Sequence, residues 1–300
     1  MSLLSVTNYT PQRVFALLRL LDAQGGELEF ETIRTWFKPE EYFSNLNTPE
    51  DANIRQMLGA ATSLDFIESP SQNRYRLNVR VPESLEAFSD LVHDRLVCVG
   101  WDNPDSIMFE AFAATVVITE MEQNTQWLEE SVKTRADRIQ AAVREADGND
   151  EENSKRFNST KMPPWKRWMI FLGLGISFPK GELYPYPVSR LEREINREIF
   201  EKREVSDRLE IDQFLNLVSR RMPYLDGGRF FESAANKSRL PHTERKLTRV
   251  LSGALRDLHD DKRVALETVG DAKQIYTLIG EPHAVKNVSI VHLNLTAVHV

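Results

Sequence analysis

The residues of this sequence that are best suited to a chemical role are basic residues near the C-terminal end. They are Lys237, Arg239, Arg245, Lys246 and Arg249. Apolar residues at helical spacing predict a helix over residues 243–259, so the cluster lies before and along the start of that helix. A DNA-reading helix presents this part of itself to the major groove, and a helix N-terminus favours a phosphate. The cluster therefore predicts contacts with nucleic-acid phosphates. The alternative is an ordinary solvated helix face.

A second basic group lies in the middle of the chain. It consists of Lys155, Arg156, Lys161, Lys166 and Arg167, which are interleaved with Phe157, Trp165 and Trp168. Basic residues beside aromatic ones suit nucleic-acid backbones or exposed bases. The alternative is that the two tryptophans, three residues apart, belong to the core.

A third basic group lies near the N-terminus. Arg74, Arg76 and Arg80 are evenly spaced, which places all three on one face of a strand. The helix before this strand offers only Arg55 and Gln56 as groove-reading side chains. We therefore favour a protein contact over a DNA contact for this part of the chain.

The sequence shows none of the patterns that we searched for as signs of catalysis. The glycine-rich stretch 173–181 lacks the G-x-x-x-x-G-K-[ST] spacing of a phosphate loop, and a hairpin turn explains it better. The six histidines show no HxH or HExxH spacing, which argues against a metal site. Cys98 lies in an apolar run and is expected in the core. We therefore predict a protein that is not an enzyme and has no catalytic residue, metal or cofactor.

Composition and charge narrow the class of protein. The chain has 300 residues, 41% of them hydrophobic and 28% charged, which suits two or three folded domains. No apolar run is long enough to span a membrane, and the start of the chain does not resemble a signal peptide. A single cysteine makes the cytoplasm the default location. The net charge of −7 is uneven: residues 81–152 carry −12, whereas residues 153–300 carry +7. The acidic part is expected to bind other protein subunits.

One order of elements recurs along the chain. A helix-spaced apolar run is followed directly by a β-hairpin at residues 53–77 and again at 244–278, where the hairpin is expected to span Val264–Leu278. A looser copy lies at 164–187. We predict a mainly α protein of the α+β class. Its three domains would be 1–81, a helical domain 82–188 with a polar loop at 147–160, and 189–300, which begins with a charged connector helix at 189–203.

The repeated helix, strand, turn and strand resemble winged-helix domains, which implies two to three winged-helix modules joined by helices. The opening SLLSVT…PQRVFALLRLL and the W-x-x-W-x-x-F-L-G-L-G segment at 165–175 look similar to DpdG-type proteins. Those proteins are encoded in bacterial clusters that insert deazaguanine bases into DNA and restrict DNA lacking them. The resemblance implies a non-catalytic member of a restriction or antiviral defence machinery.

The sequence thus predicts a non-enzymatic DNA-binding or DNA-sensing subunit of a bacterial complex, with DNA and other protein subunits as partners. Two alternatives stay open. One is a protein adaptor similar to the tandem winged-helix subunits that bind kleisins in chromosome-condensing complexes. The other is a transcription regulator, which would need one dominant recognition helix and a symmetric dimer.

Overall fold

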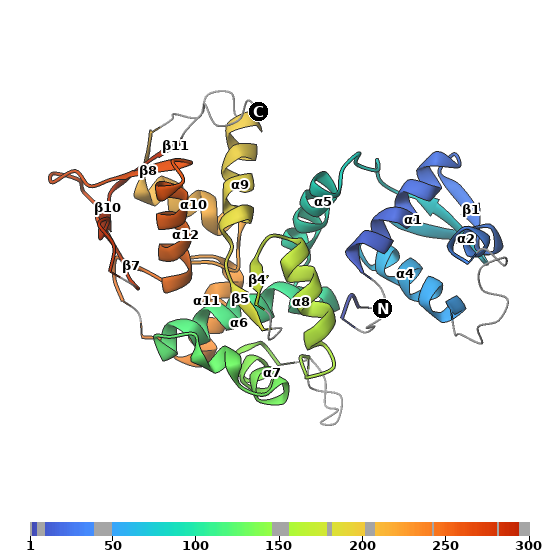
Figure 1. Cartoon of the computed structure of the whole chain (residues 1–300), viewed down its shortest axis with the longest axis horizontal. Helices are drawn as coiled ribbons and strands as arrows, with labels where there is room; N and C mark the ends of the chain where they lie inside the picture. The colour runs from blue at the N-terminus through green and yellow to red at the C-terminus, as the bar shows by residue number, and fades with distance from the viewer. Residues whose placement is uncertain are drawn as a thin grey trace. The chain divides into compact units, whose positions relative to one another are not determined.

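The computed structural model describes residues 2–4, 10–38, 50–145, 156–178, 182–201, 208–241, 243–280 and 282–293. Within these residues the protein is mainly α-helical with small β-sheets, so the predicted α+β class is confirmed (Figure 1). The chain forms two compact units. Unit 1 comprises residues 1–108 and 160–172, and unit 2 comprises residues 109–159 and 173–300.

Unit 1 contains a helical layer and a three-stranded sheet. Its elements are α1 (Pro11–Ala23), β1 (Glu27–Glu29), α2 (Phe30–Phe37), α4 (Glu50–Ser63), β2 (Ile67–Ser71), β3 (Arg74–Leu77), α5 (Leu85–Cys98), the short 3₁₀ turn η1 (Pro104–Ser106) and α8 (Met162–Phe171). All three strands are antiparallel in the order β1-β3-β2, and β3 lies in the centre. The hairpin predicted within residues 53–77 is therefore confirmed as β2 and β3.

Local sequence explains why the first helix of unit 1 forms where it does. The Thr10 side chain caps α1 by accepting a hydrogen bond from the Arg13 amide at 3.3 Å. The helix buries one apolar stripe, including Leu17 and Leu21, at 0% exposure. It ends at the two glycines 25 and 26, which adopt the left-handed φ angles of 87° and 90° that favour glycine.

Unit 2 is built around the helix α6 (Ile107–Glu122), whose first two residues belong to unit 1. Its other helical elements are η2 (Gln126–Glu129), α7 (Val132–Ala142), α9 (Val188–Glu201), α10 (Ile211–Arg221), α11 (Arg229–Ser238) and α12 (Arg249–Asp260). Residues 107–118 of α6 are buried on every side, as expected of a helix that is apolar all round. Phe109 and Phe112 pack on the ring of Tyr224, with centroids 4.6 and 5.2 Å away.

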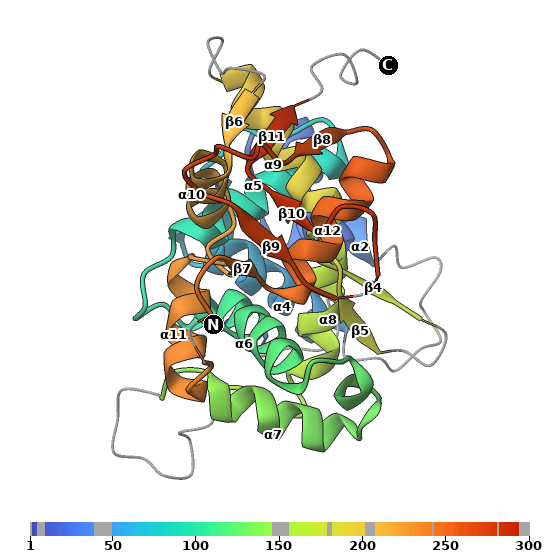
Figure 2. The ribbon, with the colours of Figure 1, turned by 90° about the vertical axis from the view of Figure 1, so that its left-hand side faces the viewer.

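The strands of unit 2 form three small sheets (Figure 2). They are β4 (Gly175–Ser177), β5 (Leu183–Pro185), β6 (Arg208–Glu210), β7 (Lys246–Leu247), β8 (Val264–Glu267), β9 (Tyr276–Leu278), β10 (Asn287–Val288) and β11 (Ile290–Leu293). The sheets have the orders β4-β5, β10-β9-β7 and β6-β11-β8. The last order repeats that of unit 1, because in both sheets the final strand lies between the first and the second.

The predicted C-terminal hairpin Val264–Leu278 is wrong. β8 pairs with β11, and β9 pairs instead with β10 and, in parallel, with β7. Four residue pairs join β8 to β11, and β11 buries three of its four residues. The prediction paired β8 with β9, the next strand in sequence. In the structure the more apolar β11, further along the chain, pairs with β8 instead. Both β10 and β11 lie beyond the end of the predicted hairpin.

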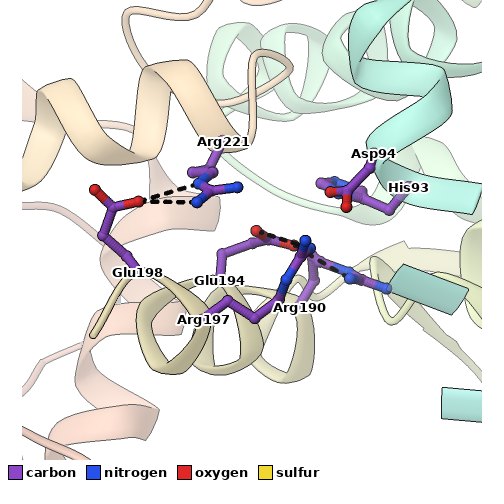
Figure 3. Close-up of polar contacts among 7 residues, drawn as sticks. All are labelled: His93, Asp94, Arg190, Glu194, Arg197, Glu198 and Arg221. Atoms are coloured by element: carbon purple, nitrogen blue, oxygen red, sulfur yellow. Dashed lines mark hydrogen bonds and ion pairs between the residues drawn. The ribbon is translucent and has the colours of Figure 1, made fainter. Parts of the chain in front are cut away.

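The charged helix predicted at 189–203 is confirmed as α9, and its role as a connector stays a prediction. α9 packs along α12 and buries Arg190, Glu194 and Glu198 at 2% exposure or less. These buried charges form ion pairs, which offset part of the cost of removing them from water. Figure 3 shows the pairs: Arg190 with Glu194 at 3.2 Å, and Arg221 from α10 with Glu198 at 3.0 Å.

The looser middle copy is divided, because α8 belongs to unit 1 and the β4–β5 hairpin to unit 2. The three domain boundaries 1–81, 82–188 and 189–300 stay a prediction. Residues 147–155 of the predicted polar loop, the predicted turn at 179–181 and most of the predicted loop at 39–50 lie outside the described residues. None of the helices in the described part of the chain combines the length and apolar character that crossing a membrane requires.

Candidate nucleic-acid interface

The C-terminal basic residues come from three elements of unit 2. Lys237 lies in the last turn of α11, where its Nζ atom pairs with Glu145 Oε1 at 3.2 Å. Arg239 caps that helix in the left-handed conformation, with φ of 54°. Arg245 also has a positive φ, 56°, and Lys246 begins β7. The side chains of all four residues reach the surface, since each residue is exposed.

The helix expected to read a groove begins later than predicted and has little free surface. α12 starts at Arg249 rather than at residue 243, because Thr248 caps it. Every residue from 247 to 259 is buried or half-buried. The chain around β9 and β10 covers it: Arg256 donates to the backbone carbonyls of Leu278 and Ile279 at 2.9 and 3.1 Å. α12 in this structure is therefore a core helix.

The N-terminus of α12 is already occupied by carboxylates of the chain itself. Asp226 accepts hydrogen bonds from the amide and the hydroxyl of Thr248, both at 2.7 Å. Glu120 accepts from the amide of Arg249 at 2.9 Å. A phosphate would need these same donors. The predicted phosphate position at this helix start is therefore filled from within.

The carboxyl of Asp226 is expected to make stability depend on pH. Burial raises its pKa to about 6, although the hydrogen bonds from Thr248 act in the opposite direction. Because this pKa lies above the ordinary value near 4, the group contributes stability that is complete below about pH 4 and is lost as the pH rises through 6. The full shift corresponds to at most about 3 kcal/mol of folding stability.

Asp226→Asn should make the urea midpoint less dependent on pH between pH 4 and 7. The exposed Asp271→Asn is the control, and equal slopes in wild type and Asp226→Asn would contradict the assignment.

With α12 covered, the basic residues border a sheet instead. Lys246, Thr277 and Asn287 lie side by side across β7, β9 and β10. Arg245 directly precedes β7, and the exposed Lys286 directly precedes β10. Lys246, Thr277 and Asn287 share one side of the sheet, and Arg245 and Lys286 are exposed at its border. We call these five residues together the basic sheet face. Lys286 was missed by the sequence reasoning, because it is far from the cluster along the chain and only strand pairing brings it near.

Arg74 and Arg76 lie on one face of β3, as predicted, but Arg80 does not, because the strand ends at Leu77. The charges of Arg74 and Arg76 are paired. Arg74 contacts Glu27 and Glu29 of β1 at 3.3 and 3.0 Å. Arg76 donates from Nε to Glu68 of β2 at 2.8 Å. Three carboxylates thus surround two guanidinium groups, which leaves no excess positive charge for phosphates. This observation agrees with the protein contact favoured for this part of the chain.

Three cations of the middle basic group stay at the surface, but its aromatic rings do not. Arg156 instead pairs with the buried Glu110 at 2.7 Å, and Lys155 lies outside the described residues. Lys161, Lys166 and Arg167 are half-exposed on and beside α8. Trp165 and Trp168 are buried at 1% exposure, so the alternative that they belong to the core is confirmed. Bases cannot stack on them, which leaves at most phosphate contacts for this group.

Two expectations about chemistry are also resolved. Cys98 is exposed in the last turn of α5, so its predicted place in the core is wrong. Among its apolar neighbours in sequence, Leu96 is buried, whereas Val97 and Val99 are half-buried. The glycine-rich stretch 173–181 contributes β4 of an antiparallel hairpin, in agreement with the hairpin expected there instead of a phosphate loop.

These features define an α+β protein with several small sheets and a basic face on one of them. The chain belongs to the DpdG-like family, whose model matches residues 1–272. Membership supports a role in the DNA deazaguanine modification system. No curated protein and no solved structure gave a match.

Proposed function

We propose that this protein is a non-enzymatic DNA-binding or DNA-sensing subunit of a bacterial restriction complex that acts in the cytoplasm. The observation that carries the proposal is the basic sheet face, together with the exposed Lys237 and Arg239 at the end of α11. Lysine and arginine side chains on a sheet bind DNA through its phosphates. The family's link to DNA modification is the second support.

The order of elements supports winged-helix modules at both ends of the chain. In unit 1 the order is α1, β1, α2, α4, β2 and β3. In unit 2 the order α9, β6, α10, α12, β8 and β11 is similar, with α11 and the β9–β10 segment added. The added strands cover α12. We therefore propose that unit 2 contacts DNA through its sheet rather than through a helix in the major groove.

A salt series with a short DNA duplex tests the proposal. Each neutralised phosphate contributes about −0.9 to the slope of log affinity against log salt, so a slope of a few units is expected. Arg245→Glu with Lys246→Glu should weaken binding at least tenfold and reduce the steepness of the slope by about 2. Arg249 is left unchanged because its half-buried position would confound folding with binding. A non-enzymatic subunit should also leave the duplex intact.

A matched control reverses two exposed charges elsewhere, Arg19→Glu with Lys133→Glu. Net charge changes equally in both variants, so only a local contact separates them. If both variants lose the same affinity, or if the wild type does not bind even at low salt, DNA binding by this face is excluded. That result would favour the protein adaptor, which the neutralised arginines of β3 and the covered α12 also support. A transcription regulator has less support, because α12 offers no exposed reading face.

A further inference from the structure

The β4–β5 hairpin of unit 2 exposes an apolar face. Ile176, Phe178 and Tyr186 are 39%, 52% and 38% exposed, and Tyr184 is half-exposed. All four lie on one face, because 176 and 178, and 184 and 186, are two residues apart and Ile176 is directly opposite Tyr184. On the other face Leu183 is buried against the unit. We call these four residues the aromatic hairpin face.

The hairpin holds its rings in a fixed arrangement. Phe178 and Tyr184 meet edge to face, with centroids 5.0 Å apart and an angle of 88°. The two strands approach closely because position 175 is glycine: a Cβ atom there would lie 2.6 Å from the carbonyl oxygen of Tyr184. Because the two rings already pack against each other, this surface loses little conformational entropy on binding.

Carboxylates lie beside Tyr184. Its hydroxyl donates to Glu129 Oε1 at 3.4 Å. Burial raises the pKa of the Tyr184 phenol, and the charges of Glu129 and Glu182 raise it further. The charge of the Arg135 guanidinium lowers the pKa of Tyr184. This arginine side chain is buried and donates a hydrogen bond to the carbonyl of Leu128 at 2.9 Å.

Carboxylates also lie beside Tyr186. The pKa of its phenol is raised to about 12, mainly by burial. A hydrogen bond to Asp257 and the charges of Asp257 and Asp261 also raise it. Both aspartates come from α12 and the residue that follows it. The aromatic hairpin face is thus bordered by four carboxylates, two beside each tyrosine, which outweigh the charge of Arg135.

We propose that the aromatic hairpin face binds an extended, arginine- and lysine-bearing segment of a partner protein. Guanidinium groups stack on tyrosine and phenylalanine rings, and the bordering carboxylates supply matched ion pairs. A nucleic acid is disfavoured at this face, because its phosphates would meet four like charges. The inference does not depend on DNA binding by the basic sheet face, which is made of other residues.

The test measures the affinity of the full chain for a labelled ten-residue peptide of alternating arginine and serine. The salt concentration is about 0.15 M, where charges beyond about 8 Å are screened. Phe178→Ser should weaken binding at least tenfold by removing a stacking surface. Glu129→Gln with Glu182→Gln should weaken it similarly and reduce its salt dependence. The same peptide with glutamate in place of arginine should not bind.

Two controls in unit 1 match these changes. Trp36→Ser removes an aromatic side chain that is 60% exposed, and Glu31→Gln with Glu83→Gln removes two exposed carboxylates. The proposal is overturned if hairpin and control variants bind the peptide equally well. It is also overturned if Phe178→Ser abolishes a self-association of the wild type, which would assign the face to a second copy of the chain. Arg245→Glu with Lys246→Glu should retain peptide binding, so failure of the DNA proposal is a separate result.

Discussion

Replacing Glu110 with alanine is expected to lower the free energy of unfolding of unit 2 by about 3–5 kcal/mol. Glu110 projects from α6 and is 3% exposed. Both of its oxygens accept hydrogen bonds from the guanidinium of Arg156 at 2.7 Å. Removing the carboxylate leaves a largely buried positive charge without its principal partner, which costs more than the pair itself contributes. Glu110 also accepts from the amide of Arg144 at 3.4 Å, so it fixes the chain on either side of residues 146–155.

The measurement is the urea midpoint, with hydrogen exchange of α6 and α7 as the local readout. Glu122→Ala is the matched control: it breaks an ion pair between Arg138 and a carboxylate that is 42% exposed, which is expected to cost under about 1 kcal/mol. Glu110→Leu combined with Arg156→Met should recover most of the loss, since it removes both charges. A similar effect of Glu110→Ala and Glu122→Ala would show that burial of the Glu110 pair does not matter.

The second large effect is expected at Asp105 in unit 1. This side chain is 1% exposed and accepts hydrogen bonds from the Ser2 hydroxyl and the Leu3 amide, both at 2.7 Å, and from the Ser63 hydroxyl of α4. Asp105→Ala removes an ionised acceptor from three donors, two of them from the segment that buries Leu3. A hydrogen bond to a charged group is worth about 1.5–3 kcal/mol, so a loss of about 3 kcal/mol is expected after partial rescue by water.

Hydrogen exchange at the amides of Leu3 and Leu4 should increase in Asp105→Ala together with a lower urea midpoint. Asp105→Asn keeps one acceptor oxygen and should be intermediate. The exposed Asp65→Ala, which removes the partner of Arg95, is the control and should change stability little. If the midpoint falls while exchange at Leu3 is unchanged, Asp105 acts on η1 alone and does not hold the N-terminal residues.

Local sequence patterns were sufficient to predict an element when its own residues show which side packs inward. The stripe of α1, the alternation of β3 and the largely apolar sequence of α6 each identify the side that packs inward, without reference to the rest of the chain. The same reasoning placed Trp165 and Trp168 in the core as an alternative reading. It could not separate that reading from nucleic-acid stacking, because both use the same spacing.

Patterns along the chain were misleading wherever a residue's surroundings come from elsewhere. The charged helix α9 was predicted as a connector, and nothing in its sequence shows that Arg190 and Glu194 are buried and pair with each other. Arg74 and Arg76 were identified as a basic face, but their partners Glu27, Glu29 and Glu68 become visible only through the register of the sheet.

The sequence by itself determined the α+β class, the main helices, the N-terminal hairpin and the basic character of the C-terminal part. It could do so because helical and strand periodicity and turn chemistry act over a few residues. Only the tertiary structure decided that β8 pairs with β11, that α12 is covered, and that its N-terminus is filled by Asp226 and Glu120. Those outcomes depend on contacts between residues far apart in the chain, whose free energies compete across the whole unit and leave no mark on local spacing.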